Sequence, residues 1–134
     1  MDSDICGIHD YVAWGENFTP RYIEKETLLQ RDAQGRMLYS DGVDYSGQPI
    51  LLTEYGGIAF DCESDENWGY FGSVQDEDSF FKRYASITEA IRNMPYIRGY
   101  CYTQLTDVMQ EVNGLMTADR KPKVNIERAR AINS

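Results

Sequence analysis

From Pro49 to Gly57 the sequence reads Pro-Ile-Leu-Leu-Thr-Glu-Tyr-Gly-Gly, a short apolar run that ends on the carboxylate of Glu54 and then breaks at two glycines. An apolar run without alternation is typical of a strand that is buried on both faces of a parallel sheet. In a barrel of parallel strands, residues at the carboxyl ends of the strands line the active-site mouth. The stretch therefore predicts a buried parallel strand that delivers Glu54 to the mouth of a barrel.

The segments on either side repeat an alternation of strand and helix. Short apolar runs predict strands over residues 5–11 and 100–105. A helix is expected over residues 19–31, with Thr19 as its N-cap, Pro20 at its first position and Phe18 packed on Ile23. Apolar residues at steps of three and four predict a helix over residues 76–96, and a last helix begins near Asn125. This order favours a parallel α/β fold.

Length and charge narrow the fold and the partners. A chain of 134 residues is one domain, and it is too short for a complete (β/α)8 barrel, which typically needs ~250 residues. The 22 acidic and 13 basic residues give a net charge of -9, which disfavours nucleic acid as a partner. No apolar run approaches the ~20 residues that span a bilayer, so no membrane association is expected.

The cysteines match neither a disulfide framework nor a zinc site. Cys6, Cys62 and Cys101 are odd in number and widely separated. A reducing compartment is the simplest interpretation, which favours a cytoplasmic location. The turn-rich acidic residues Asp32 and Asp41 lack the spacing of a calcium loop, and we expect neither a metal nor a cofactor.

Three segments together resemble a known family. These are the stretch around Glu54, the stretch Gly99-Tyr-Cys-Tyr-Thr-Gln-Leu-Thr-Asp107, and the stretch Asn113-Gly-Leu-Met-Thr-Ala-Asp-Arg-Lys-Pro-Lys123. In this order they are similar to glycoside hydrolase family 2, the family of β-galactosidases and β-glucuronidases. The resemblance implies that residues 1–134 form a C-terminal fragment of the catalytic TIM barrel, roughly its last three βα units. It also implies a retaining β-glycosidase, similar to the β-galactosidases.

By this resemblance Glu54 is the catalytic nucleophile. A retaining glycosidase needs two carboxyl groups, one that attacks the anomeric carbon and one that serves as acid and base. The acid/base glutamate of the family lies upstream of the segments that match, so the isolated chain is expected to be inactive. Alternatively, Glu54 caps the strand or accepts hydrogen bonds from the backbone amides of the Gly56-Gly57 turn.

A second residue of the family contacts the nucleophile from the end of the first matching strand. It is a Tyr or a His, whose polar hydrogen keeps the carboxylate ionised and oriented. His9 or Tyr11 fills this position, and the register of the strand does not distinguish them. His9 has a second interpretation, in which it bonds to a nearby group such as Asp10.

The last matching strand carries the expected sugar-binding residues. Aligned on Gly99 and Asp107, Thr103 takes the position of a stacking Trp in the family and Gln104 takes that of an Asn, while Asp107 itself is matched. The usual stacking platform is therefore missing. Trp68 or Tyr70, in the preceding loop, either supplies an aromatic face instead or packs on the barrel rim.

The resemblance also bears on the substrate. Glucuronidases of the family carry an Asn-x-Lys pair before the Gly-x-x-Thr segment, where the lysine meets the substrate carboxylate. This chain has Gln110-Glu111-Val112-Asn113 at that place. Because Glu111 would repel a uronate carboxylate, we expect a neutral β-glycoside such as a galactoside.

Two alternatives to a catalytic fragment stay open, namely a non-catalytic carbohydrate-binding or interaction fragment and a self-assembling half-barrel. Three strands taken from eight leave two open edges and an uncovered sheet face. We expect Ile50, Leu52, Tyr100 and Tyr102 on that uncovered face, which predicts a homo-oligomer of the fragment.

Overall fold

The computed structural model describes residues 3–30, 35, 37–60 and 72–134. Its centre is a three-stranded sheet in the order β1-β2-β5, in which both pairs of strands are parallel. The strands are β1 (Cys6–Asp10), β2 (Ile50–Gly56) and β5 (Ile97–Thr103). The predicted α/β arrangement with parallel strands is confirmed. Within the described ranges, no helix combines the length and the apolar character that crossing a membrane requires.

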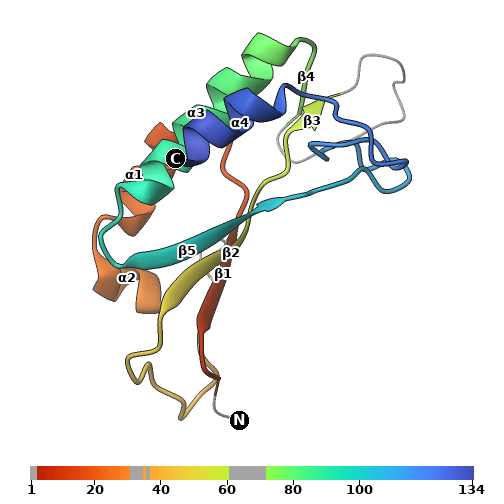
Figure 1. The fold of residues 1–134 in the computed structure, drawn as a ribbon. Coiled ribbons are helices and arrows are strands. Elements are labelled where there is room, and N and C mark those ends of the chain that lie inside the picture. Colours follow the sequence, from red (N-terminus) through yellow and green to blue (C-terminus); the bar gives the residue numbers. More distant parts are fainter. Residues whose placement is uncertain (1–2, 31–34, 36, 61–71) are drawn as a thin grey trace.

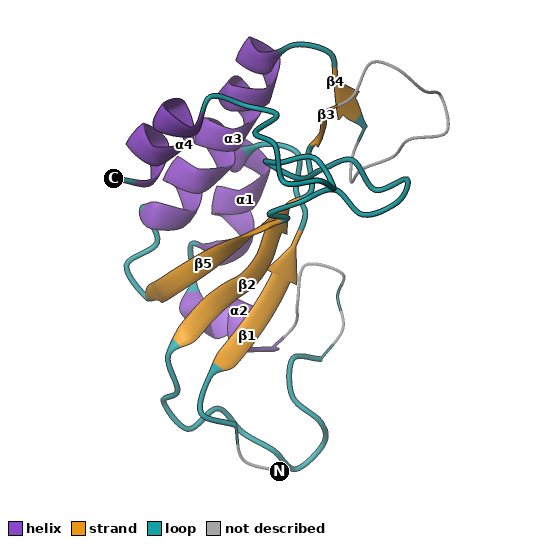
Figure 2. Cartoon of the chain, turned by 45° about the vertical axis from the view of Figure 1, so that its right-hand side comes forward, coloured by secondary structure: helices purple, strands orange, loops and turns teal. Residues whose placement is uncertain are grey.

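Helices lie on one side of this sheet. They are α1 (Gly15–Tyr22), α2 (Lys25–Gln30), α3 (Glu77–Arg92) and α4 (Ile126–Asn133). Figures 1 and 2 show them gathered against one face, while the opposite face carries no helix in the described part of the chain. A second, two-stranded parallel sheet pairs β3 (Ala59–Phe60) with β4 (Ser73–Val74).

The predicted helices α3 and α4 begin at polar caps. Asp76 precedes α3 and accepts a hydrogen bond of 2.7 Å from the backbone N–H of Ser79, which lowers the pKa of the Asp76 carboxyl. Asn125 caps α4 in the same way, through the backbone N–H groups of Glu127 and Arg128. The helix α3 ends at Arg92, three residues before Pro95.

The expected start of the first helix is wrong. The helix α1 begins at Gly15, and Pro20 lies inside it instead of at its first position. The reason is a long-range contact. The N–H of Gly15 donates to Ser86 Oγ of α3 at 3.0 Å, and a Cβ at position 15 would lie 2.1 Å from the Ser86 carbonyl oxygen. Close packing on α3 therefore sets where α1 begins, and it overrides the local capping signal at Thr19.

The expected contact between Phe18 and Ile23 is also absent. Ile23 is exposed, and Phe18 instead stacks on Tyr22 with ring centroids 4.1 Å apart. Both rings are fully buried in the core between α1 and the sheet. A spacing of four residues places these two rings on one face of α1, which directs that face towards the core.

The structure also corrects which side chains face away from the helices. Ile50 and Leu52 are buried in the core between the sheet and the helices, and Tyr102 packs on Tyr84 of α3. Tyr100 contacts the buried Tyr55 ring from the same side. The uncovered face instead carries small or polar residues and one leucine, which are Gly7, Leu51, Thr53 and Gly99.

A β-bulge in β2 sets this pattern. Ile8 pairs with Leu52, but the next residue of β1, His9, pairs with Glu54, so β2 has one extra residue at this point. The register with β5 shifts over the same stretch. As a result Leu52 and Tyr55 both point into the core, while Thr53 and Glu54 between them are only partly buried. The bulge turns the Glu54 side chain out of the core.

Candidate functional site

Glu54 lies near the carboxyl end of β2, and two side chains converge on its carboxylate, one from β1 and one from the residue that follows β1. The Tyr11 hydroxyl donates to Oε2 of Glu54, and Nδ1 of His9 lies 3.3 Å from the same oxygen. The parallel pairing explains this meeting, because His9 is the register partner of Glu54 and Tyr11 follows two residues later. The sequence left His9 and Tyr11 as alternatives, and the structure brings both to Glu54.

Asp10, between these two residues, points in the opposite direction. Its carboxylate, only 1% exposed, accepts hydrogen bonds from Arg21, from the Tyr22 hydroxyl at 2.7 Å and from the Val12 backbone at 3.0 Å. Burial, followed by the charge of Asp10, raises the pKa of Tyr22, so the phenol remains a donor. The sequence suggested Asp10 as a partner for His9. It instead anchors the end of β1 to α1.

The two glycines after Glu54 connect β2 to the end of β5. Gly56 has φ 93°, and a Cβ there would lie 2.3 Å from the Tyr102 ring, so the left-handed backbone and the close ring both require glycine. The N–H of Gly57 donates to the carbonyl oxygen of Thr103 at 2.8 Å. Thr103 therefore lies beside the turn that follows Glu54.

The Tyr102 side chain connects this turn to the loop after β5. Its hydroxyl accepts from the Ile58 N–H at 3.3 Å and donates to the Asn113 carbonyl oxygen at 3.2 Å. Burial raises the pKa of Tyr102, which keeps the hydroxyl protonated and able to donate. The end of β2, the end of β5 and the loop after β5 are thus tied to one side chain.

Gln104 continues from Thr103 and pairs with the loop through its backbone. Its N–H donates to the Asn113 carbonyl oxygen at 3.4 Å, and its carbonyl oxygen accepts from the Leu115 N–H at 3.1 Å. The side-chain nitrogen of Gln104 and the side-chain oxygen of Asn113 are buried without a hydrogen-bond partner in the described part of the chain. The other amide atom of Asn113, Nδ2, donates to Glu111 Oε1 at 3.0 Å.

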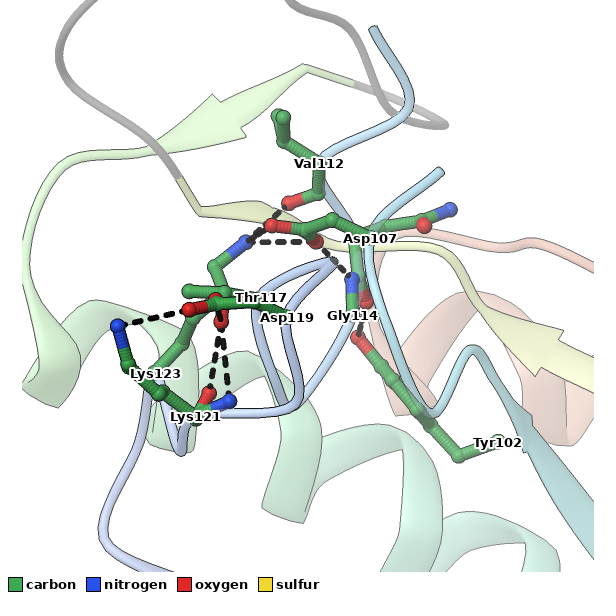
Figure 3. Close-up of polar contacts among 9 residues, drawn as sticks. Tyr102, Asp107, Val112, Gly114, Thr117, Asp119, Lys121 and Lys123 are labelled. Carbon is green, nitrogen blue, oxygen red and sulfur yellow. Dashed lines mark hydrogen bonds and ion pairs between the residues drawn. The ribbon is translucent and has the colours of Figure 1, made fainter. Parts of the chain in front are cut away.

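Asp107, expected among the sugar-binding residues, has partners inside the loop. Figure 3 shows its carboxylate against the ammonium of Lys123, with both carboxylate oxygens 2.8 Å from Nζ. One of these oxygens also accepts from the Gly114 N–H at 2.8 Å, and Lys123 donates to the Val112 carbonyl oxygen at 2.9 Å. In this geometry Asp107 holds the loop together. Trp68, the other expected binding residue, and Tyr70 lie outside the described residues.

Two lysines of the basic run at 120–123 form ion pairs. Besides the Lys123 pair, Lys121 lies 2.7 Å from Asp119. The two pairs differ in exposure: the Lys121 and Asp119 side chains are 78% and 61% exposed, whereas those of Lys123 and Asp107 are 10% and 14% exposed. Losing one partner of a buried ion pair lowers the free energy of unfolding more than losing one partner of an exposed pair does.

This difference gives a matched test of the loop. Lys123→Met is expected to lower the free energy of unfolding by about 2 to 4 kcal/mol, because it leaves Asp107 charged and nearly buried. Lys121→Met should change it by less than about 1 kcal/mol. Urea denaturation of both variants measures the difference. Adding Asp107→Asn to Lys123→Met should recover part of the loss, and equal effects of the two lysine variants would contradict this role of Lys123.

The site as a whole presents one carboxylate with two side-chain contacts on one oxygen. Oε1 of Glu54 has no hydrogen bond or ion pair with any residue in ranges 3–30, 37–60 and 72–134. No group of three or more His, Cys, Asp or Glu side chains within these ranges is arranged to hold a metal ion. A half-exposed carboxylate that is held at one oxygen and open at the other is suited to nucleophilic attack.

Comparisons with solved structures find the same fold inside larger enzymes. A Bifidobacterium dentium β-glucuronidase complexed with coumarin-3-O-glucuronide superimposes with a TM-score of 0.58 at 19% identity, over 96% of this chain and 20% of that one. A Faecalibacterium prausnitzii β-glucuronidase has a TM-score of 0.59 at 17% identity, over 95% of this chain and 21% of that one. A GH2 β-galacturonidase from Eisenbergiella tayi has a TM-score of 0.60 at 16% identity, over 96% of this chain and 23% of that one. No family model and no curated protein matches the sequence.

The chain thus spans about a fifth of the length of the solved chains that it matches. The likeness covers nearly all of this chain, so the chain has the fold of one part of these larger enzymes. The resemblance predicted from three short segments is therefore confirmed at the level of the fold.

Proposed function

We propose that residues 1–134 form the C-terminal part of the catalytic barrel of a retaining β-glycosidase, roughly its last three βα units, with Glu54 as the nucleophile. The observation that carries this proposal is the placement of Glu54 at the carboxyl end of a parallel strand, turned out of the core and held at Oε2 by Tyr11. The fold shared with family 2 enzymes supports it.

In this proposal each residue at the site has one task. Oε1 of Glu54 attacks the anomeric carbon while the leaving oxygen takes a proton from an acid that this chain does not supply. The resulting glycosyl ester is later broken by water. Tyr11 donates to Oε2, which fixes the orientation of the carboxylate and aims the free oxygen. The 134-residue chain alone is therefore inactive, and the activity belongs to a longer parent protein.

The sugar is proposed to lie over the ends of β2 and β5. Thr103 and Gln104 border this position. Asp107 contributes indirectly, by fixing the loop that follows these two residues. A role for Trp68 as an aromatic face rests on the sequence alone.

A mechanism-based inhibitor tests the assignment of the nucleophile. A 2-deoxy-2-fluoro glycosyl fluoride traps the covalent ester of a retaining enzyme, because the fluorine at C2 slows both oxocarbenium-like steps while the fluoride leaving group at C1 keeps formation faster than hydrolysis. Incubated with the parent enzyme and digested, the labelled peptide is expected to carry the sugar on Glu54. A label on any other carboxylate would overturn the assignment.

The substrate is proposed to be a neutral β-glycoside. Glu111 accepts from Asn113, so the stretch that holds a lysine in glucuronidases is here acidic and internally hydrogen-bonded. The parent is expected to prefer a nitrophenyl galactoside to the matching glucuronide in kcat/KM, because the charge of Glu111 opposes a uronate. Glu111→Gln should reduce the ratio of kcat/KM for the galactoside to kcat/KM for the glucuronide.

The fold-related enzymes give this prediction a clear rival. Those compared above are described as acting on uronides, which makes a uronide the second candidate substrate. A measured preference of the parent for the glucuronide or the galacturonide would establish this rival and refute the neutral substrate.

A non-catalytic carbohydrate-binding or self-assembling fragment remains the alternative function. The inhibitor experiment separates these alternatives from catalysis, because only a retaining enzyme acquires a covalent label.

We also propose that the 134-residue chain assembles with itself through its open sheet edges. Ile50 and Leu52 are buried within the chain, so they do not drive association. The outer edges of β1 and β5 still have no strand partner in the three-stranded sheet. Such edges recruit other strands. We therefore expect the 134-residue chain to self-associate at micromolar concentration in sedimentation experiments.

A variant on the exposed edge strand tests this expectation. Cys101 is exposed on β5, and Cys101→Lys should weaken the association by adding a charge to that strand. A compact monomer of the unmodified chain that melts cooperatively would show that the edges do not drive assembly.

A further inference from the structure

Tyr11, which holds the nucleophile in the proposed function, lies on a connection between two elements. β1 ends at Asp10 and α1 begins at Gly15, so residues 11–13 belong to neither a strand nor a helix. The Tyr11 hydroxyl nevertheless reaches Oε2 of Glu54. The direction of this side chain therefore depends on the contacts that hold the connection.

Buried side chains hold the backbone of the 11–13 connection. The Val12 N–H donates to Oδ1 of Asp10 at 3.0 Å, and the Ala13 carbonyl oxygen accepts from Nε of Arg83 at 3.0 Å. Arg83 lies on α3, the helix that also binds the start of α1 through Ser86. The connection is therefore held from the helix side of the sheet, where Figures 1 and 2 show α1 and α3 together.

Arg83 is itself buried, which is uncommon for a cation. It is 4% exposed, and burial lowers the pKa of its guanidinium because water no longer solvates the charge. Besides the Ala13 contact, one terminal nitrogen donates to the Gly72 carbonyl oxygen at 3.4 Å. An apolar side chain would fill the same space without the cost of burying a charge. The guanidinium is therefore suited to fixing the backbone groups that it binds.

Arg83 also lies close to the turn that follows Glu54. Burial raises the pKa of Tyr102, and the nearby charge of Arg83 acts in the opposite direction. The Tyr102 hydroxyl accepts from the Ile58 N–H at the end of this turn. One buried cation thus lies next to the connection that carries Tyr11 and next to the side chain that supports the end of β2.

We propose that Arg83 is a positioning residue for the nucleophile and acts through the 11–13 connection. This inference rests on the proposed function, because Glu54 is the group that Arg83 positions. Nε of Arg83 fixes the Ala13 carbonyl, and two residues earlier the Tyr11 hydroxyl fixes Oε2 of Glu54. Without the guanidinium the connection shifts, and a displacement of ~1 Å in such a site costs roughly 10²-fold in rate. Residues of this chain bury Arg83, so its contacts do not depend on what a longer parent adds.

A double-mutant cycle in the parent enzyme tests this route. Arg83→Met removes the donors and keeps an unbranched side chain, and it should lower kcat for a nitrophenyl glycoside roughly 10²-fold with little change in KM. Tyr11→Phe should have an effect of similar size. Because both changes act on Glu54 through the same contact, adding Arg83→Met to Tyr11→Phe should lower kcat by less than about threefold more. A separate structural role of Arg83 would give the full product of the two effects.

Tyrosine NMR on the 134-residue chain measures the contact without catalysis. The chain has ten tyrosines, and Tyr11→Phe identifies the Tyr11 signal after the ring Cζ carbons are labelled with ¹³C. This carbon bears the hydroxyl, so its chemical shift responds to the hydrogen bond. Glu54→Ala provides the shift of a Tyr11 hydroxyl that has lost its carboxylate. We expect Arg83→Met to move the Tyr11 signal towards that value.

Arg92→Met is the matched control. Arg92 lies at the other end of α3 and also donates to a backbone carbonyl oxygen, that of Ile132 at 2.8 Å. Its replacement should leave both kcat and the Tyr11 signal unchanged. Circular dichroism shows whether each variant folds. If Arg83→Met does not, Arg83→Lys takes its place in both experiments, because lysine keeps the charge but not the planar fork of donors.

The outcomes separate this inference from the proposed function. An unchanged kcat or an unmoved Tyr11 signal in the Arg83 variant would overturn the role of Arg83, while an inhibitor label on Glu54 would still support the nucleophile. A loss that multiplies in full with that of Tyr11→Phe would also overturn it. A moved Tyr11 signal together with an inhibitor label on another carboxylate would instead overturn the proposed function, because Arg83 would then orient a contact that takes no part in the attack.

Discussion

Replacing Glu54 with glutamine in the parent enzyme is expected to lower kcat by roughly 10⁴-fold or more, the range seen when a residue that acts as a unit with its partners is removed. An amide of the same shape keeps the contact with Tyr11 but does not attack the anomeric carbon. Steady-state kinetics with a nitrophenyl glycoside measures the loss. Glu111→Gln, which changes another glutamate in this part of the chain, should keep most of the activity.

A smaller variant distinguishes a nucleophile from a carboxylate that only shapes the site. Glu54→Gly leaves room for azide, which can attack the anomeric carbon from the face that Glu54 occupied. The product is expected to be a glycosyl azide of inverted configuration, while the leaving group departs with the proton of the acid. Retention of configuration, or activity of Glu54→Gln within tenfold of the parent, would show that another group attacks.

Phe80→Ala is expected to lower the free energy of unfolding by about 3 to 5 kcal/mol, which is a large part of the stability of a small domain. Phe80 is fully buried on α3, and its ring lies against Phe60, Phe81, Tyr84 and Tyr102 at centroid distances between 5.4 and 6.4 Å. Removing it opens a cavity between α3, β3 and β5 that rigid neighbours cannot fill.

Denaturant unfolding followed by circular dichroism measures this loss. Ile23→Ala, which truncates a large apolar side chain that is exposed, serves as the control and should change the free energy of unfolding by about 0.5 kcal/mol or less. Phe80→Leu should fall between the two, because it retains part of the volume. A loss below about 1 kcal/mol for Phe80→Ala would mean that the aromatic cluster repacks and that α3 is not the main support of the sheet.

Local patterns in the sequence were sufficient for much of the architecture. The apolar run before Glu54 identified β2, the spacing of Phe80, Tyr84 and Ile87 identified α3, and Asn125 marked the start of α4. Each of these signals depends on neighbours within a few residues, which is why periodicity and capping reveal them. The placement of Glu54 at the end of a parallel strand followed from the same local evidence.

Other features required contacts between distant segments. The start of α1 at Gly15 depends on Ser86, and the Asp107 ion pair depends on Lys123, so no local signal indicated either. The meeting of both His9 and Tyr11 with Glu54 likewise depends on the pairing of β1 with β2.

The sequence by itself determined that a carboxylate ends a buried parallel strand, and only the tertiary structure decided where that carboxylate points. Strict alternation from Leu52 would place Glu54 on the same face as Leu52, which is the core face. The bulge at residues 53–54 adds one residue to β2 and reverses the alternation. Its position is fixed by the register of β2 against β1 and β5. That register comes from the packing of whole strands, which a run of nine residues does not contain.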